Sequence, residues 1–300
     1  MTQNPTPSHA GPSRRSFITA GVAGLAALGL NRSAFGAGRI RTIAAGANDP
    51  TIIFVHGFAC AADDYQAQID ALSSSYRCIA LDLPGHGASA MPAQPTMAAL
   101  AQAVNDVKER SGARKVILAG HSMGSKVVRE AYRQSTEGVV GLVFIDGSVY
   151  SGNPDTINAN LRAQLAREGY KEWAKRQFDS MVMDNGDPKL RQRLAARAQA
   201  LDPDFAEALL VDAVRWELPS GLESMKHIAV PTLLLQSTYF TSDYKRVPLK
   251  DGIKTPFMEL APKVIAQCEV RTISGVGHFP MIEAAPVVNQ HFREFAARVA

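Results

Sequence analysis

The chain has 300 residues, of which 46% are hydrophobic and 20% are charged, so it can bury a sizeable core and does not have the composition of a disordered protein. Its formal net charge is +4, but three arginines lie in the first 36 residues, which contain no acid, so the rest of the chain carries +1. A nearly neutral remainder gives no electrostatic reason to expect binding to nucleic acid or to an anionic membrane.

The first 36 residues have the pattern of an export signal. Residues 14–18 read Arg-Arg-Ser-Phe-Ile, which resembles the twin-arginine signal. The apolar run that follows, over 19–30, is shorter than the roughly 20 residues that a membrane-spanning helix needs. The small residues Ala34 and Gly36 fit the two positions that a signal peptidase requires. We therefore expect residues 1–36 to be a signal peptide, a periplasmic or secreted location, and no stable membrane insertion after signal removal.

From residue 51 onward, short apolar runs alternate with longer amphipathic segments. Such runs are typical of strands that are buried on both faces of a parallel sheet. The expected strands are 51–55, 76–81, 115–119, 139–145, 232–235 and 268–273. The expected helices between them are 62–73, 96–111, 123–134 and 284–298. This alternation predicts an α/β fold with a doubly wound, mostly parallel sheet, whose ligands bind at the carboxyl ends of the strands.

One interval interrupts this alternation. About 85 residues between Ile145 and Thr232 contain no strand-like run, which is too long for a plain connection. Helical patterns cover 155–183, 187–200 and 203–215. We therefore expect a helical cap over residues 148–228, inserted into a core that consists of residues 37–147 and 229–300.

The central motif is Gly-His-Ser-Met-Gly at residues 120–124. It matches Gly-x-Ser-x-Gly, and it follows a predicted strand and precedes a predicted helix, which is the context that this motif requires. The turn is so tight that glycine is needed on both sides of the serine, where a Cβ would clash. This arrangement exposes the hydroxyl at the N-terminus of the helix, so the motif predicts Ser122 as a nucleophile.

Four segments together resemble the α/β-hydrolase superfamily, in its order and with its spacing. They are Phe-Val-His-Gly-Phe at 54–58, Leu-Asp-Leu-Pro-Gly-His-Gly-Ala-Ser at 81–89, the serine motif at 120–124, and Gly-Val-Gly-His at 275–278. The resemblance runs from about residue 50 to residue 298. It implies the α/β-hydrolase fold and an enzyme similar to serine esterases.

A serine hydroxyl needs a base that takes its proton. Of the seven histidines, His278 follows the last predicted strand and matches the catalytic histidine of the family. The other six are expected to be structural, on the surface, or removed with the signal. The resemblance also assigns the oxyanion hole, which consists of backbone N–H groups. These groups belong to Phe58 and Met123.

The acidic partner of His278 is harder to assign. In most of this family it follows the strand that is predicted here over 232–235. The stretch after that strand reads Gln-Ser-Thr-Tyr-Phe-Thr-Ser before it reaches Asp243, so this acid comes about three residues late. Some members carry the acid after the preceding core strand, where Asp146 stands. We favour Asp146, with Asp243 as the alternative and with Asp82 and Glu283 as weaker candidates.

These features predict a serine hydrolase that cleaves a small-molecule carboxylic ester, lactone or thioester through an acyl-enzyme. Two alternatives are a cofactor-free perhydrolase (haloperoxidase-like) and a non-catalytic ligand-binding protein on the same fold. The sequence has no phosphate loop, dinucleotide fingerprint or metal-ligand spacing, so we expect no cofactor and no metal. Substrate identity, oligomeric state and any pairing among Cys60, Cys78 and Cys268 stay open.

Overall fold

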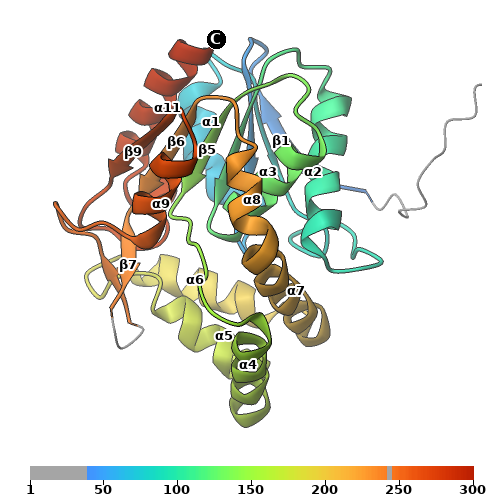
Figure 1. Cartoon of the computed structure of the whole chain (residues 1–300), viewed down its shortest axis with the longest axis vertical. Coiled ribbons are helices and arrows are strands. Elements are labelled where there is room, and N and C mark those ends of the chain that lie inside the picture. Colours follow the sequence, from blue (N-terminus) through green and yellow to red (C-terminus); the bar gives the residue numbers. More distant parts are fainter. Residues whose placement is uncertain (1–38, 242–244) are drawn as a thin grey trace, which may run out of the picture. The chain divides into compact units, whose positions relative to one another are not determined.

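A seven-stranded sheet forms the centre of the protein in the computed structural model, which describes residues 39–241 and 245–300 (Figure 1). Its strands lie in the order β1 (Thr42–Ala45), β3 (Cys78–Leu81), β2 (Thr51–Val55), β4 (Val116–His121), β5 (Val139–Ile145), β6 (Thr232–Gln236) and β9 (Cys268–Thr272). All strands except β1 run parallel to their neighbours. The predicted signal peptide and Asp243 lie outside the described residues.

Helices cover both faces of this sheet, and a hydrophobic cluster fills each interface. On one face lie η1 (Ala62–Tyr65), α1 (Gln66–Leu72), α10 (Pro280–Glu283) and α11 (Ala285–Val299). On the other face lie α2 (Met97–Ser111), α3 (Met123–Gln134), α8 (Leu222–Lys226) and α9 (Pro256–Val264). Every residue of β2, β3 and β4 is buried, as expected of strands covered on both faces. The predicted fold class is therefore confirmed.

Three strands do not correspond to a predicted one. β1 pairs antiparallel with β3 at the edge of the sheet, and its half-exposed residues form no continuous apolar run. The strands β7 (Thr238–Phe240) and β8 (Arg246–Pro248) form a separate antiparallel hairpin directly after β6. Each has only three residues, which is too short for a periodic pattern to identify.

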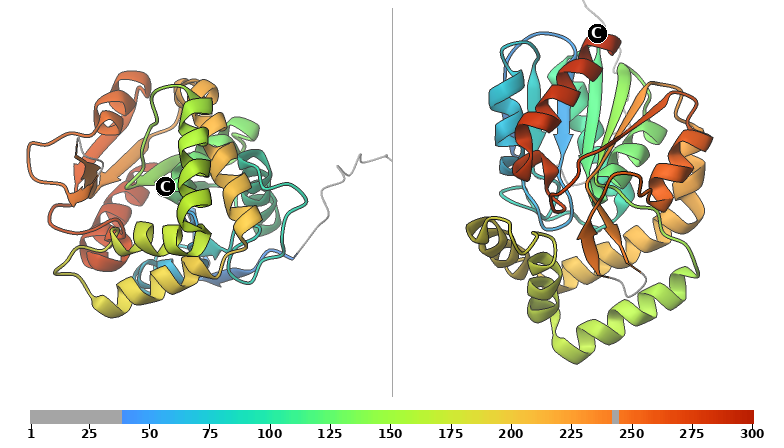
Figure 2. Two further views of the ribbon diagram at one scale, coloured as in Figure 1. Left: turned by 90° about the horizontal axis from the view of Figure 1, so that it is seen from below. Right: turned by 90° about the vertical axis from the view of Figure 1, so that its left-hand side faces the viewer.

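The interval between β5 and β6 is helical, and its first helices lie beyond one end of the sheet, below it in the view of Figure 1 (Figures 1 and 2). It contains α4 (Pro154–Glu168), α5 (Tyr170–Asp179), α6 (Pro188–Gln199), α7 (Pro203–Trp216) and the π-helix η2 (Glu217–Gly221), followed by α8. The pattern over 155–183 is divided at Gly169, whose φ of 77° ends α4. None of the helices in the described ranges has both the length and the apolar character that crossing a membrane requires.

Helices α4, α6 and α7 share one local reason for where they begin. Each has proline at its first position, where the missing N–H costs nothing, after a capping Asn153, Asp187 or Asp202. The side chain of each capping residue accepts a hydrogen bond from an N–H group in the first turn. The start of each of these helices is therefore encoded locally in the sequence.

Candidate active site

Ser122 lies on a sharp turn between β4 and α3. Its backbone has φ of 52° and ψ of −119°, a conformation that is strained for a residue with a Cβ. The flanking glycines permit the turn, because a Cβ at Gly120 would lie 2.2 Å from the Gly124 carbonyl oxygen. A Cβ at Gly124 would lie 2.3 Å from the Val55 carbonyl oxygen. The motif therefore forms the strand–turn–helix element, with the serine at the helix N-terminus.

Two backbone N–H groups in segments that adjoin Ser122 donate no hydrogen bond to another described residue. They belong to Phe58, in the loop after β2, and to Met123, the first residue of α3. The loop passes close to the serine, since a Cβ at Gly57 would lie 3.1 Å from the Ser122 Cβ. Unpaired N–H groups beside a nucleophile are the donors that a developing oxyanion needs.

Asp146 and His278 form a buried pair at the carboxyl end of the sheet. Asp146 follows β5, His278 lies in the loop after β9, and both side chains are at most 3% exposed. Asp146 Oδ2 accepts a hydrogen bond from His278 Nδ1 at 2.6 Å. Because Nδ1 then carries the hydrogen, Nε2 keeps its lone pair. A general base that receives a hydroxyl proton needs this tautomer.

The last residue of β6 and the two residues after it hold the Asp146 carboxylate. Its Oδ1 accepts hydrogen bonds at 2.8 Å from the Ser237 N–H and at 2.8 Å from the Thr238 N–H. Gln236 Nε2 donates to the same oxygen at 2.8 Å, and Thr238 Oγ1 donates to Oδ2 at 2.5 Å. At the end of β6, where most of the family carries the acidic partner of the histidine, this chain thus has residues that donate hydrogen bonds to Asp146. Asp243 lies outside the described residues.

Arg246, on β8, lies against this buried pair. Its Nη1 donates to Thr238 Oγ1 at 2.8 Å and lies 3.6 Å from Asp146 Oδ2. The same nitrogen is 3.1 Å from His278 Nδ1. Because the one hydrogen on Nδ1 is donated to the nearer Asp146, Arg246 forms no hydrogen bond with this nitrogen and acts on the ring as a nearby positive charge. Burial raises the pKa of Asp146, but His278, Arg246 and Thr238 lower it by more.

Burial and the Arg246 charge lower the pKa of His278 to about 4, although the hydrogen bond to Asp146 acts in the opposite direction. The imidazole is therefore neutral at neutral pH, which is the state that a general base must start from. Among the described residues, Ser122 Oγ makes no hydrogen bond to this ring. The separation between a nucleophile and its base is often long before substrate binds. The Ser122 N–H donates to the Ile145 carbonyl at 2.9 Å, which fixes the turn beside the strand that carries Asp146.

The backbone of His278 is anchored from two directions. His121 Nε2 lies 2.7 Å from the His278 carbonyl oxygen, and the two ring centroids are 4.6 Å apart. Burial lowers the pKa of His121 to about 3, so its ring is neutral and Nε2–H donates. The His278 N–H donates to the Met181 carbonyl at 2.8 Å, in the loop after α5. The histidine loop thus connects β4 with the inserted helices.

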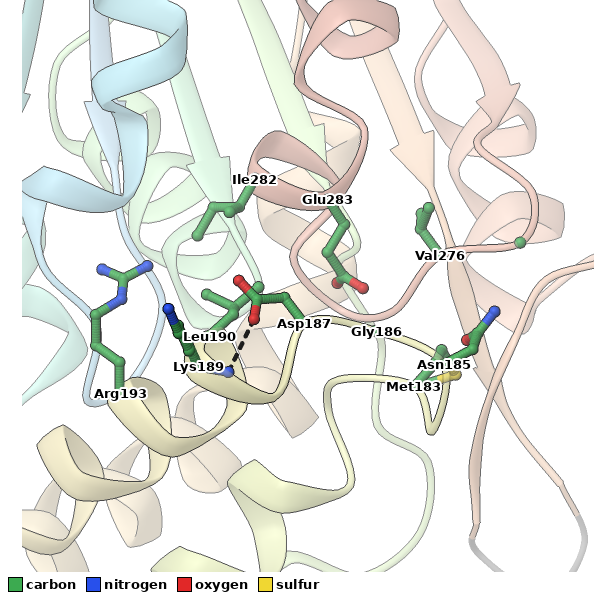
Figure 3. A pocket seen from close by; sticks show the side chains of 11 residues that line it. Met183, Asn185, Gly186, Asp187, Lys189, Leu190, Arg193, Val276, Ile282 and Glu283 are labelled. Atoms are coloured by element: carbon green, nitrogen blue, oxygen red, sulfur yellow. Dashed lines mark hydrogen bonds between the residues drawn. The ribbon is translucent and has the colours of Figure 1, made fainter.

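A cavity of about 520 Å³ separates the loop after α5 from the loop after β9 (Figure 3). Met183 and Asp187 line it from the loop between α5 and α6, Val276 lines it from the loop after β9, and Glu283 lines it from the end of α10 (Figure 3). The Glu283 carboxylate accepts the Gly277 N–H at 3.0 Å, and burial raises its pKa. Glu283 is thus engaged in holding the turn before His278, away from the Asp146 pair.

An arginine of the inserted helices holds the loop that carries the Phe58 N–H. Arg197, on α6, donates through Nε to the Ala59 carbonyl at 3.0 Å and pairs with Asp64. Ala59 has φ of 52°, which residues other than glycine rarely adopt. Asp64 accepts the Ala61 N–H at 3.1 Å. The unusual bend next to Phe58 is therefore fixed by contacts from two segments.

Three residues that the sequence analysis did not place in the site contact it. His121 stands at a predicted strand end beside the serine, which was the one available signal for a role near the site. Arg246 and Arg197 belong to no sequence motif, and no local pattern marked them, because they contact segments far away in the sequence. Asp82, a weaker candidate for the acid, accepts the N–H of Ala88 at 2.9 Å and braces its own loop.

The three cysteines, Cys60, Cys78 and Cys268, are all free thiols. Burial raises the pKa of Cys60 to about 12 and that of Cys78 to about 12, so both thiols are protonated and unreactive at neutral pH. Within residues 39–241 and 245–300, no three His, Cys, Asp or Glu side chains are grouped in a way that would hold a metal ion.

Comparison with known proteins assigns the chain to a family. The model described as "Alpha/beta hydrolase family" matches residues 52–290. An esterase from Thermogutta terrifontis has a similar structure, with a TM-score of 0.73 and 23% sequence identity, over 87% of this chain and 94% of that one. At this identity the likeness concerns the fold.

Two curated relatives with similar sequences are not named as esterases. The dihydrolipoyllysine-residue acetyltransferase component of an acetoin cleaving system from Cupriavidus necator is 32% identical over 136 residues, which are 43% of this chain and 36% of that protein. The chain thus spans about a third of that relative. A 2-succinyl-6-hydroxy-2,4-cyclohexadiene-1-carboxylate synthase from Yersinia pestis is 26% identical over 227 residues, which are 71% of this chain and 79% of that protein.

Proposed function

The chain belongs to the α/β-hydrolase family, and from this premise we propose that it is a serine hydrolase that cleaves a carboxylic ester, lactone or thioester through an acyl-enzyme intermediate. The observation that carries the proposal is one arrangement at the carboxyl end of the sheet. It combines the strained Ser122, two unpaired N–H groups next to it, and the buried Asp146–His278 pair. Each part matches one requirement of acyl transfer.

In the proposed reaction, Ser122 Oγ attacks the substrate carbonyl carbon while His278 Nε2 takes the hydroxyl proton. The oxygen of the tetrahedral intermediate accepts hydrogen bonds from the Phe58 and Met123 N–H groups, each of which lowers the barrier by roughly 3–4 kcal/mol. His278 then gives its proton to the leaving alcohol or thiol. Asp146 stabilises the imidazolium that exists between these two transfers.

The second half of the reaction uses the same groups. Water replaces the alcohol, His278 takes a proton from it, and the resulting hydroxide attacks the acyl-enzyme carbonyl. Collapse of the second tetrahedral intermediate releases the carboxylic acid, and His278 returns the proton to Ser122. The neutral ring at neutral pH suits both attacks, because each begins with proton uptake by Nε2.

Covalent labelling tests this proposal. A fluorophosphonate should label the wild-type protein once and abolish hydrolysis of a panel of esters that differ in acyl and alcohol size. Ser122→Ala should take no label and lose hydrolysis, whereas Ser75→Ala, which changes an exposed serine outside the site, should behave like the wild type. Full ester hydrolysis by Ser122→Ala would contradict the mechanism.

The same panel separates the two alternatives. Labelling of Ser122 together with formation of a peracid from hydrogen peroxide and a carboxylic acid, without ester hydrolysis, would replace the proposal by a perhydrolase. Absence of labelling and of all turnover, with retained ligand binding, would replace it by a binding protein. Because the Yersinia pestis relative is named a 2-succinyl-6-hydroxy-2,4-cyclohexadiene-1-carboxylate synthase, formation of that compound is a further activity to include in the panel.

We also propose the domain organisation and location that the sequence predicts. Residues 148–228 act as a cap on the core, which their contacts with the Ala59 and His278 backbones support. Residues 1–36 direct export by the twin-arginine route to the periplasm or beyond. Replacing Arg14 and Arg15 with lysine should leave the precursor in the cytoplasm, and unchanged export of this variant would contradict the assignment.

A further inference from the structure

A second cavity, of about 450 Å³, lies beside the residues that hold Asp146. Its walls come from the segments that follow β5 and β6, from the hairpin of β7 and β8, and from the start of α9. Gln236, Thr238 and Arg246 line it, and all three contact Asp146, but neither Ser122 nor His278 lines it. Its volume falls within the roughly 300–1,000 Å³ of small-molecule sites.

Aromatic side chains line this cavity and make it suitable for an apolar body. They are Tyr150, Tyr239, Phe240 and Phe257. Tyr150 is 41% exposed and Phe240 is 52% exposed, which places both among the few exposed large hydrophobic side chains of the described residues. A ligand that covered these two rings would remove apolar surface from water, which favours its binding.

The polar part of the cavity is positively charged. Arg246 and Lys254 line it, and no aspartate or glutamate among the described residues does. Lys254 is exposed and forms no ion pair within the described part of the chain. Two cations without a lining acid favour an anionic group on the ligand.

The guanidinium of Arg246 is already oriented. It lies over the Phe240 ring, with its central carbon 4.3 Å from the ring centroid, and its side chain is 13% exposed. Its contacts with Thr238, His278 and Asp146 all use Nη1. Within the described residues, the hydrogens on Nε and Nη2 therefore have no acceptor. This edge of a guanidinium matches the two oxygens of a carboxylate.

From these observations we propose that the cavity is a binding site for carboxylic acids with an aromatic or other apolar body. The carboxylate binds Nε and Nη2 of Arg246 and faces Lys254, and the body packs against Phe240 and Tyr150. The acid has two sources that share this chemistry. It is either the acid that hydrolysis releases or an acid that the protein meets independently of its own reaction.

Binding is measured by calorimetry on the full chain carrying Ser122→Ala, so that the result does not depend on hydrolysis. 3-Phenylpropionate should bind, and neutral 3-phenylpropanamide, which has the same body, should bind at least about tenfold more weakly because it lacks the charge. Lys254→Gln should weaken binding of the acid about fivefold and Phe240→Ala about threefold. Both positions lie outside the proposed catalytic groups.

Lys250→Gln is the matched control, since it removes the same charge from a nearby exposed lysine that does not line the cavity. It should leave the dissociation constant unchanged. Equal affinity for acid and amide, or equal affinities of the Lys254→Gln and Lys250→Gln proteins, would overturn the proposal. An acid that binds normally to Phe240→Ala would also overturn it.

A second set of titrations identifies the source of the acid. Each acid product of the esters that the wild-type protein cleaves is titrated into the Ser122→Ala protein beside unrelated arylalkanoic acids. Product acids that bind through Lys254 identify the reaction itself as the source, whereas binding of unrelated acids alone identifies an external one. Absence of hydrolysis with retained binding would contradict the proposed function but leave this inference standing.

Discussion

Arg246 Nη1 stands 3.1 Å from the same His278 nitrogen that Asp146 binds at 2.6 Å. A carboxylate next to an imidazole favours the protonated ring, whereas a guanidinium next to the imidazole favours the neutral ring. Burial and Arg246 together outweigh Asp146, so the pKa of His278 falls to about 4. Within the described part of the chain, the other titratable groups that face the pair are His121, which is neutral, and Glu283, which is bonded to the histidine loop. The His278 imidazole is thus kept unprotonated into the acidic range.

Replacing Arg246 with glutamine should shift the acidic limb of the pH profile. The change removes one of the two causes that lower the pKa of His278, so this pKa rises and the ring becomes protonated at a higher pH. The acidic limb of kcat/KM should move upward by about 1 pH unit, measured from about pH 4 to pH 9. Arg246→Lys, which keeps the charge, should stay close to the wild type. An unchanged limb in Arg246→Gln would contradict this account.

Asp146→Asn should reduce kcat by about 10³- to 10⁴-fold, because the amide stabilises neither the Nδ1–H tautomer nor the imidazolium. Asp243→Asn, the matched change at the alternative position, should stay within about twofold of the wild type. Steady-state kinetics at one pH measures both effects, and circular dichroism checks that the proteins are folded. A larger loss in Asp243→Asn would move the acid to that position.

Arg197→Gln should lower kcat about tenfold and leave KM within about twofold, because Arg197 holds the bend next to the Phe58 N–H and not the substrate itself. A boronic acid that mimics the tetrahedral state should lose affinity in parallel. Arg193→Gln is the control, because this side chain pairs with Asp64 at 3.5 Å and forms no hydrogen bond to the Ala59 bend among the described residues. A fall in thermal stability with unchanged kcat and boronate affinity would reduce Arg197 to a structural role.

Gly124→Ala should destabilise the protein by about 3 kcal/mol or more, because its Cβ would lie 2.3 Å from a backbone oxygen that cannot move aside. Gly112→Ala is a useful comparison. It has φ of 65° but nothing within 4 Å, so it should lose only about 1 kcal/mol to backbone strain. Urea unfolding measures both free energies. Equal losses would mean that the close approach at Gly124 is not what requires glycine.

The sheet was predictable because its strands are continuous apolar runs bounded by polar residues. The run Val139–Ile145 gives β5 with the same limits in sequence and structure. The serine turn was predictable because only glycine fits on both sides of it. β1 was not predictable, since an edge strand with half-exposed residues has neither a continuous run nor a clear alternation.

The partners of the candidate site were less accessible to sequence reasoning. Thr238 and Asp146 are 92 residues apart, and Arg197 and Ala59 are 138 residues apart. No local pattern marks such contacts, which exist only once the strands are in register. The sequence analysis favoured Asp146 because it follows the core strand after which some members of the resembled family carry the acid.

The way in which Asp146 is held has a consequence for how this protein can change. Two of the four hydrogen bonds that it accepts from Gln236, Ser237 and Thr238 come from the backbone N–H groups of Ser237 and Thr238, which any residue except proline would supply at these positions. The hairpin that begins at Thr238 therefore does not carry the acid, and most of its side chains do not hold it. At hairpin positions other than Thr238 and Arg246, ligand preference can be altered by mutation, in the laboratory or by natural variation, while the proposed Ser–His–Asp chemistry stays intact on β4, β5 and the loop after β9.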